Sequence, residues 1–333
     1  MEIKSIIKEV CLDGGPGICL FALREKEAAE GIRNAGASET ERALKILREN
    51  GIRQVIFSGF RALDCPDGEN IVKTAVGLGM SAGTAISLEE ADAQKLLAWT
   101  EAGLSKIYIG MSSLLNSLDD REKFMAGCAE TAAMLKAAGQ ADAVACVSLN
   151  RAIDPEAACA MLEQLGFKSA LFDLDGIKIG SGAEADGSVH TVEEVLAMID
   201  IAAAVKNNIL INSPGYWRDM RGLFTGERQS FVCQGGYKLF FLDSRLQLRR
   251  CPQAGAALCA IEAFNGSQAV RDGCVACQNA FFRNYSIGLQ SLTSFSDGLH
   301  SLCFNQRSRA AKQWLDLRNA ESLKFVFKNM KNL

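Results

Sequence analysis

The sequence predicts an α/β protein: a partial (β/α)6 barrel followed by a small cysteine-rich α+β extension. Short apolar runs alternate with amphipathic helical segments over the first 210 residues. Strict strand–helix alternation requires right-handed crossovers and a parallel sheet. Cysteines then crowd between residues 233 and 277, where the alternation has stopped, and mark the extension. A doubly wound open sheet is the alternative to the barrel.

Six apolar runs are expected to form the barrel strands, each followed by a helix. The strands are expected at 9–13, 53–58, 79–85, 105–110, 142–148 and 168–174, and the helices at 38–50, 68–78, 87–102, 120–138, 155–165 and 191–206. Three helices open with capping-box spacing, at Ser38/Glu41, Ser87/Glu90 and Thr191/Glu194. The glycine-containing segment 14–37 is then a loop after the first strand, at the barrel end where sites are built.

The chain divides where the alternation breaks, at Asn212-Ser213-Pro214-Gly215. We expect a barrel domain over 1–212 and an extension over 213–305. A basic C-terminal helix is expected over 306–333, a segment that contains seven Lys and Arg residues and two acidic residues.

The composition narrows the class of protein and its partners. Of the 333 residues, 48% are hydrophobic and 23% are charged, as in a soluble globular protein. A net charge of −3 offers no general attraction to nucleic acid, which is therefore not expected as a partner. No apolar run reaches the roughly 18–20 residues of a membrane span, and the N-terminus lacks a signal-peptide pattern. We expect a cytoplasmic protein.

Twelve cysteines are many for a cytoplasmic chain, where disulfides are disfavoured. Cys274-Val-Ala-Cys277 allows two thiolates to approach one metal, and a hairpin from Cys233 to Cys251 would bring two more. Four thiolates suit a tetrahedral zinc ion or an iron–sulfur cluster. Only one pair is short-spaced, which favours the cluster over zinc. Six further cysteines are expected to be core thiols or, for the first two, spare ligands: Cys259, Cys303, Cys65, Cys128, Cys146 and Cys159.

This layout resembles the radical SAM enzymes, which have a partial (β/α)6 barrel. Many of them carry a twitch or SPASM extension that binds an auxiliary [4Fe-4S] cluster. The stretch from Cys233-Gln-Gly-Gly to Cys251 is similar to the opening of that extension, although Leu246 stands where a turn glycine is usual. The resemblance implies one auxiliary [4Fe-4S] cluster held by Cys233, Cys251, Cys274 and Cys277.

The family's Cys-x3-Cys-x2-Cys motif follows the first strand and holds the cluster that cleaves SAM. When GGPGICLFA is aligned with it, Gly15, Cys19 and Ala22 stand at the three ligand positions. One thiolate cannot replace three in holding a cluster. The sequence therefore predicts that this site is degenerate.

The family's Gly-Gly-Glu-Pro motif ends the second strand and contacts the methionine amino group of SAM. VIFSGFRALDCPD aligns with it: Gly59 is kept, and Phe60, Arg61 and Ala62 replace the rest. Arg61 would face an ammonium group, a repulsion of roughly 4 kcal/mol at about 4 Å and an effective dielectric near 20. Arg61 could instead hold a carboxylate or phosphate, the alternative being a salt bridge or a solvent-exposed position. Asp173 and Asp175 could coordinate a cation or a polar ligand, the alternative being a simple strand-end turn.

Three functions follow from these patterns. The first is a pseudoenzyme with a radical SAM-like fold and one auxiliary cluster, acting as a partner, scaffold or electron-transfer component in a biosynthetic or maturation system. The second is an active enzyme, either a radical SAM enzyme with unusual cluster ligation or a barrel adapted to another reaction. The third is a zinc-stabilised binding protein. A protein partner or a peptide substrate is expected, and no catalytic residue is assigned.

Overall fold

The computed structural model describes residues 17–24, 34–111, 139, 141–149, 153–174, 177–179, 189–270, 274, 277 and 279–290. Several expectations lie outside these residues: the strand at 9–13, the helix at 120–138, the C-terminal helix at 306–333, Gly15, Cys128, Asp175 and Cys303.

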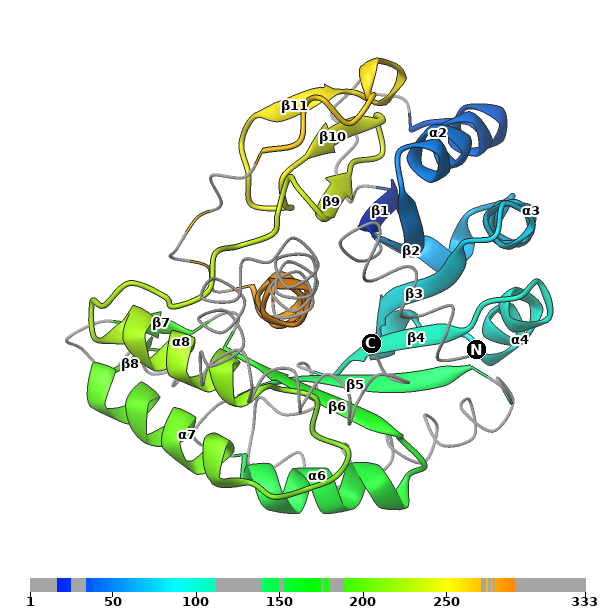
Figure 1. Cartoon of the computed structure of the whole chain (residues 1–333). Coiled ribbons are helices and arrows are strands. Elements are labelled where there is room, and N and C mark those ends of the chain that lie inside the picture. Colours follow the sequence, from blue (N-terminus) through cyan, green and yellow to red (C-terminus); the bar gives the residue numbers. More distant parts are fainter. Residues whose placement is uncertain are drawn as a thin grey trace, which may run out of the picture.

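A nine-stranded sheet forms the centre of the described chain and curves into an open C (Figure 1). Its order is β11-β10-β9-β1-β2-β3-β4-β5-β6, so β11 and β6 are its ends and the barrel is not closed. The strands are β1 (Gly17–Arg24), β2 (Ile52–Gly59), β3 (Ser81–Ser87), β4 (Lys106–Gly110), β5 (Asp142–Ser148), β6 (Ser169–Asp173), β9 (Leu239–Leu242), β10 (Gln247–Arg249) and β11 (Ala257–Ala260).

Strands β1 to β6 are parallel, as the alternation predicted, and β9 joins β1 in parallel. Only β10 and β11 run antiparallel to their neighbours. The extension therefore continues the barrel sheet through β9. The short strands β7 (Lys178–Ile179) and β8 (Val189–His190) pair separately.

Helices cover the convex face of this sheet (Figure 1). They are α2 (Ala37–Glu49), α3 (Gly68–Gly77), α4 (Ala93–Glu101), α6 (Pro155–Gln164) and α7 (Val192–Ala204), and α8 (Pro214–Phe224) packs against α7. Single 3-10 turns occur at η1 (Ala62–Asp64), η2 (Leu88–Glu90) and η5 (Ile261–Ala263).

One of the three expected capping boxes is present, between Thr191 and Glu194 at the start of α7. The other two expectations were wrong. Helix α2 begins earlier than predicted, and the Gly36 N–H donates to the Glu39 carboxylate. Helix α4 is capped by the Asp92 carboxylate, which accepts two backbone N–H groups. Matching spacing is not sufficient, because Ser38 lies inside α2 and Ser87 still belongs to β3, so neither stands at the start of its helix.

The first observed strand corrects the expected loop over 14–37. Residues Gly17–Arg24 form β1, which pairs with β2 on one side and β9 on the other. Gly17 suits the strand because a Cβ there would lie 2.6 Å from the Ile52 side chain. The cluster of glycines suggested a loop, but the apolar run ICLFAL after it is long enough for a buried strand.

The two faces of the sheet have different partners. Phe21 and Phe57 lie in register with ring centroids 6.2 Å apart, and Phe57 contacts Trp99 of α4 edge-on. These side chains thus point to the helix layer. Tyr108 of β4 points to the inside of the C, where its ring meets Phe281.

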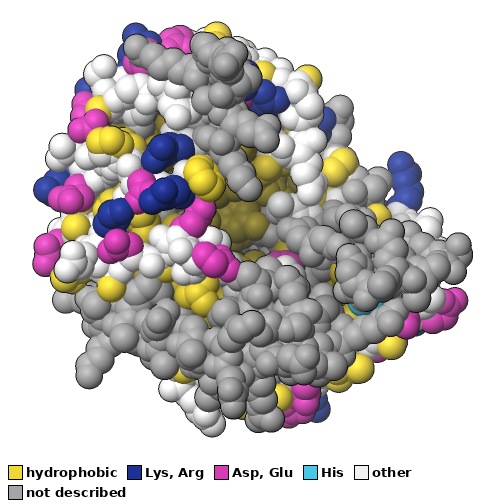
Figure 2. Space-filling model, turned by 180° about the vertical axis from the view of Figure 1, so that it is seen from behind, with side chains coloured by type: hydrophobic (Ala, Val, Ile, Leu, Met, Phe, Trp, Pro, Cys, Tyr) yellow, Lys and Arg dark blue, Asp and Glu magenta, His cyan; other side chains and the backbone are white. Residues whose placement is uncertain are grey.

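The inside of the C is occupied by a helix over residues 280–290, called the lumen helix below (Figure 1). Phe282, Arg283, Ser286 and Ile287 are each 0% exposed. A helix that is buried on all sides belongs to the protein core. The face of the molecule opposite to that of Figure 1 is hollowed, with hydrophobic side chains on the floor of the hollow (Figure 2).

Candidate metal centre

Three of the four predicted ligands lie together. The sulfur atoms of Cys233, Cys274 and Cys277 all lie within 4.8 Å of one another. Cys233 and Cys277 are buried, while Cys274 is exposed. Three close thiols with one exposed member can bind a metal ion or cluster that enters from solvent.

The backbone around the three cysteines is held by hydrogen bonds between distant segments. The Cys233 N–H donates to the Cys274 carbonyl at 3.2 Å. The side chain of Gln229 bonds both backbone groups of Cys277, donating to its carbonyl and accepting from its N–H, each at 2.8 Å. These bonds preorganise the two segments that carry the thiols.

Hydrogen-bond donors also reach a sulfur. The Gly235 N–H lies 3.3 Å from Cys233 Sγ, and the Ser286 hydroxyl lies 3.8 Å from it. Donors to metal-bound sulfur are the surroundings that tune thiolate metal sites. Gly235 is required here by space, since a Cβ would lie 2.8 Å from the Arg250 carbonyl oxygen and 3.2 Å from Cys233 Sγ.

The surroundings raise the pKa of both buried thiols of the group. Hydrogen bonding with Cys274 and burial raise the pKa of Cys233, and hydrogen bonding with Cys233 and Cys274, with burial, raises the pKa of Cys277. Adjacent thiolates repel in a buried site, so three of them need a cation. A soft metal supplies that charge, and sulfur donors select zinc or iron–sulfur clusters. The donor set therefore fits a thiolate-bound metal site, as either of the two cofactors considered from the sequence would require.

The fourth predicted ligand, Cys251, is not a member of this group. It lies two residues after the end of β10 and is half-buried. The carbonyl of its neighbour Arg250 approaches Gly235. Its role as a ligand stays a prediction. Cys259 lies in β11 and is also not a member.

The turn that leads to Cys251 has the conformation expected for a glycine. Leu246 has φ +61°, in the left-handed region that non-glycine residues seldom adopt. The Asp243 carboxylate accepts the N–H groups of Arg245 and Gln247 and thereby holds the turn. The resemblance to radical SAM enzymes predicts a turn glycine at this residue.

Two of the three residues aligned with the ligands of the SAM-cleaving cluster lie in a strand and not in the expected loop. Cys19 and Ala22 lie within β1. Cys19 is 0% exposed, lies opposite Val55 and shares a face with Phe21, so it points to the helix layer. Burial raises its pKa well above the usual range for a thiol. The segment that follows β1, residues 25–36, contains no cysteine.

Gly59 has a structural role at the end of β2. It has φ +105°, and a Cβ would lie 2.2 Å from the Arg24 carbonyl oxygen. The Phe60 N–H donates to that same oxygen at 3.0 Å. This joins the carboxyl ends of β1 and β2.

Arg61 forms a salt bridge, one of the two environments expected for it from the sequence. Its guanidinium pairs with the Asp64 carboxylate, which also pairs with Lys95 of α4. The Lys95 hydrogen bond is the main reason why the pKa of Asp64 is lowered. The three charges line a cavity of about 470 Å³ with Leu63, Cys65, Pro66, Glu69 and Trp99.

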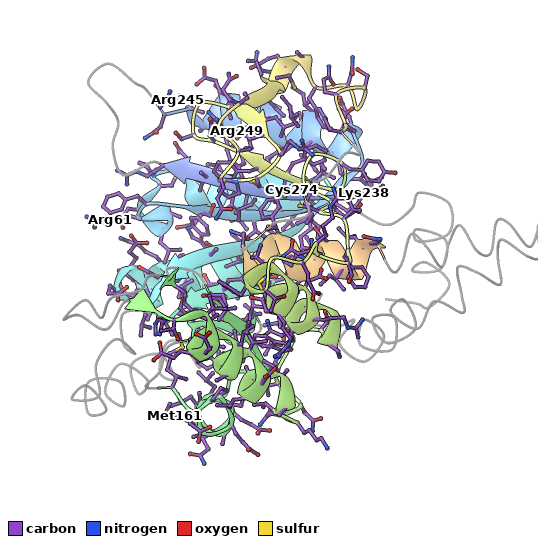
Figure 3. The ribbon with its side chains drawn as sticks, turned by 90° about the vertical axis from the view of Figure 1, so that its left-hand side faces the viewer. Arg61, Met161, Lys238, Arg245, Arg249 and Cys274 are labelled. Carbon is purple, nitrogen blue, oxygen red and sulfur yellow. The ribbon has the colours of Figure 1, made fainter. Side chains whose placement is uncertain are left out.

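The two regions lie toward opposite ends of the barrel (Figure 3). Arg61 follows the carboxyl end of β2, and Cys233 precedes the amino end of β9, which is parallel to β1. The lumen helix lies between them, where Tyr285 contacts Tyr108.

Several contacts of the cysteine group and of the lumen helix were not predicted from the sequence. Gln229, Ser286 and the ion pair of Asp219 with Arg283 carry no local motif. Among the expected core thiols, Cys159 is buried, and Cys65 and Cys146 are half-buried. Asp173 ends β6 and is half-buried.

Comparison with solved structures identifies the fold. SuiB from Streptococcus suis bound to its precursor peptide SuiA has a TM-score of 0.52 at 8% identity, covering 80% of this chain and 67% of that chain. SuiB bound to S-adenosylmethionine has a TM-score of 0.51 at 9% identity, covering 74% of this chain and 64% of that one. AnSMEcpe with bound AdoMet and the Cp18Cys peptide has 0.51 at 9% identity, covering 95% and 99%. These are radical SAM enzymes.

This chain has the radical SAM fold. The open parallel sheet agrees with the partial barrel of that fold. The chain spans less than two thirds of the SuiB structure with S-adenosylmethionine. No family model and no curated protein sequence matches the chain. None of the helices in the described ranges is long and apolar enough to cross a membrane.

Proposed function

We propose that this radical SAM-fold protein holds one auxiliary iron–sulfur cluster and has lost the cluster that cleaves SAM. In this proposal the cluster is a [4Fe-4S] cluster bound by Cys233, Cys274 and Cys277, with Cys251 as the fourth ligand. The protein then serves as a partner, scaffold or electron-transfer component in a biosynthetic or maturation system.

The single observation that carries the proposal is the convergence of three thiols at one end of the barrel. The other end supports it by contrast. The segment 25–36 after β1 has no sulfur donor, and Cys19 points away from the inside of the barrel. A thiolate-held cluster needs several sulfurs in one place.

The cluster would supply one-electron redox chemistry, while the residues of this chain bind and position it. Gln229 fixes the backbone of Cys277, and the Gly235 N–H and the Ser286 hydroxyl donate toward Cys233 Sγ. Exposed Cys274 lies on the solvent side, where a partner that exchanges electrons could approach. A peptide or protein is the proposed partner, and SuiB and anSMEcpe are themselves described with bound peptides.

Metal analysis of anaerobically purified protein tests the proposal. We expect about four irons and about four sulfides per chain, since one cubane cluster contains that number. About eight irons would instead support a second cluster and an active enzyme. Changing Cys274 and Cys277 to alanine should abolish the iron and its absorbance. Cys159→Ala, which removes a buried thiol in α6, should leave both unchanged.

A zinc-stabilised binding protein is the second candidate, and the spacing of the sulfurs favours it. Zinc–sulfur bonds of about 2.3 Å in a tetrahedron place the sulfurs roughly 3.8 Å apart. Sulfurs within 4.8 Å of one another could therefore hold one ion with little movement. A cluster binds each thiolate to a different iron and needs a wider spacing. One zinc per chain after aerobic and anaerobic purification alike would establish this candidate and contradict the cluster.

A further inference from the structure

The lumen helix lies directly against both the cysteine group and the strands of the barrel. We propose that it couples the two: Ser286 positions Cys233, and occupancy of the metal centre governs how Tyr285 seats against Tyr108. The inference rests on the proposed function only in requiring that an iron–sulfur cluster or a zinc ion binds at Cys233, Cys274 and Cys277.

The Ser286 hydroxyl lies between a backbone donor and the Cys233 sulfur. Its Oγ accepts the Gln234 N–H at 2.8 Å, so the oxygen is engaged as an acceptor and its own proton can point elsewhere. Cys233 Sγ lies 3.8 Å away within the same buried region. Ser286 is 0% exposed, so water does not compete for this proton. Ser286 is thus a positioning residue for the thiolate.

The neighbouring residue reaches the opposite partner. The Tyr285 hydroxyl is hydrogen-bonded to the Tyr108 hydroxyl of β4, and both rings are buried. Phe281, one turn earlier, packs edge-on against Tyr108 with centroids 5.8 Å apart. Consecutive residues point about 100° apart around a helix. One turn of the helix therefore contacts both a metal ligand and the inside of the barrel.

Further contacts along the lumen helix hold it in place. Arg283 pairs with Asp219 of α8, the Asn284 amide oxygen accepts the Ser213 N–H, and Gln290 accepts the Val232 N–H. The helix begins just after Cys277, with the Asn279 side chain accepting the Phe282 N–H. A shift of the segment that carries Cys274 and Cys277 cannot be absorbed locally, because a closely packed interior transmits displacement.

Metal binding should then stabilise the seated helix. A ligand that binds one arrangement shifts the population toward it in proportion to its differential affinity. In this structure the three thiols lie together while Ser286 of the seated helix lies 3.8 Å from Cys233 Sγ. Loss of the metal would release this constraint and loosen the packing of the lumen helix against β4.

Hydrogen–deuterium exchange on the full chain tests the coupling. Protein stripped with a chelator is compared with protein reloaded with Fe²⁺ and sulfide, or with Zn²⁺. We expect at least tenfold slower exchange in peptides covering 280–290 and 104–111 on loading, with no change in α6. Ser286→Ala should lower metal retention, alter the cluster absorbance and reduce this protection. Tyr285→Phe should keep the metal but lose the protection at 104–111.

Matched variants separate these effects from general instability. Ser244→Ala removes another buried hydroxyl, one without a hydrogen-bond partner in the described chain, and should behave as wild type. Ser286→Thr keeps the hydroxyl and should retain the metal. If the wild type binds neither metal, the proposed function fails. If it binds metal but exchange over 280–290 is unchanged, or if Ser286→Ala retains metal and absorbance, only the coupling fails.

Discussion

Gln229 and Cys277 exchange two hydrogen bonds of 2.8 Å across 48 residues of sequence. The side-chain amide of Gln229 substitutes for a strand neighbour and satisfies both backbone groups of the cysteine. Gln229 is 5% exposed and Cys277 is 6% exposed, so water cannot replace the bonds. The placement of the Cys277 backbone therefore depends on a residue that has no metal-binding chemistry of its own.

Gln229→Ala should destabilise the fold and weaken metal retention. It leaves a buried N–H and a buried carbonyl without partners, at a cost of about 2–4 kcal/mol in the free energy of unfolding. Urea unfolding and metal content measure the two effects. Gln268→Ala removes a side chain that also bonds two backbone groups, those of Asn265 and Ala263, in an exposed loop. An equal loss in both variants would contradict a special role for Gln229.

Breaking the ion pair of Asp219 and Arg283 should be costly from either side. Arg283 is 0% exposed and Asp219 is 2% exposed, and Asp219 also accepts the Ser230 N–H at 2.6 Å. Removing one partner of a buried pair costs about 3–5 kcal/mol because the other charge is left uncompensated. Asp219→Leu and Arg283→Met should each show this loss in chemical denaturation. The double variant should recover part of it, and strict additivity would refute the coupling.

Gly59→Ala should destabilise far more than Gly51→Ala. Both glycines have positive φ, +105° and +85°, so each substitution introduces left-handed backbone strain. Only at Gly59 does the added Cβ also collide, at 2.2 Å from the Arg24 carbonyl oxygen, whereas Gly51 has nothing within 4 Å. We expect about 1 kcal/mol for Gly51→Ala and more than about 2 kcal/mol for Gly59→Ala. Equal thermal unfolding temperatures would show that β1 and β2 do not meet as described.

Lys106 should make stability depend on pH above neutrality. It is 7% exposed at the start of β4, and burial lowers its pKa to about 8, with Asp142 opposing the shift. Between pH 8 and the usual value of 10.5, the unfolded chain holds a proton that the folded chain has lost. The contribution of this group to stability therefore rises with pH in that window, by up to about 1.4 kcal/mol per unit.

Lys106→Met isolates this effect from other titrating groups. The variant should be more stable than wild type at pH 7, by at most about 3 kcal/mol. The difference should shrink as the pH rises from 8 to 10. Urea titrations at pH 7, 8, 9 and 10 on both proteins measure it. A difference that does not change with pH would assign the effect to packing.

Incubation with SAM and a strong reductant should yield no 5′-deoxyadenosine. The physical reason is the absence of cysteine from residues 25–36, together with the outward orientation of Cys19. Chromatography of the reaction measures the product, and an enzyme that cleaves SAM serves as the positive control. Product above the protein-free background would overturn the proposed loss of the SAM-cleaving cluster.

The sequence by itself determined the order of strands and helices over most of the barrel and the cysteines at its end. Strand and helix periods are local properties, and β2 to β6 were predicted to within two residues at each boundary. The exception is β1, where three glycines in Gly14–Gly17 indicated a loop although the following apolar residues form the strand.

Tertiary structure alone decided which side chains surround the thiols and what fills the barrel. Gln229 meets Cys277 across 48 residues, Ser286 meets Cys233 across 53, and Tyr285 meets Tyr108 across 177. No local pattern encodes such pairs, because the chain between them can take many paths. Only the packed sheet and its lumen helix bring them within hydrogen-bonding distance.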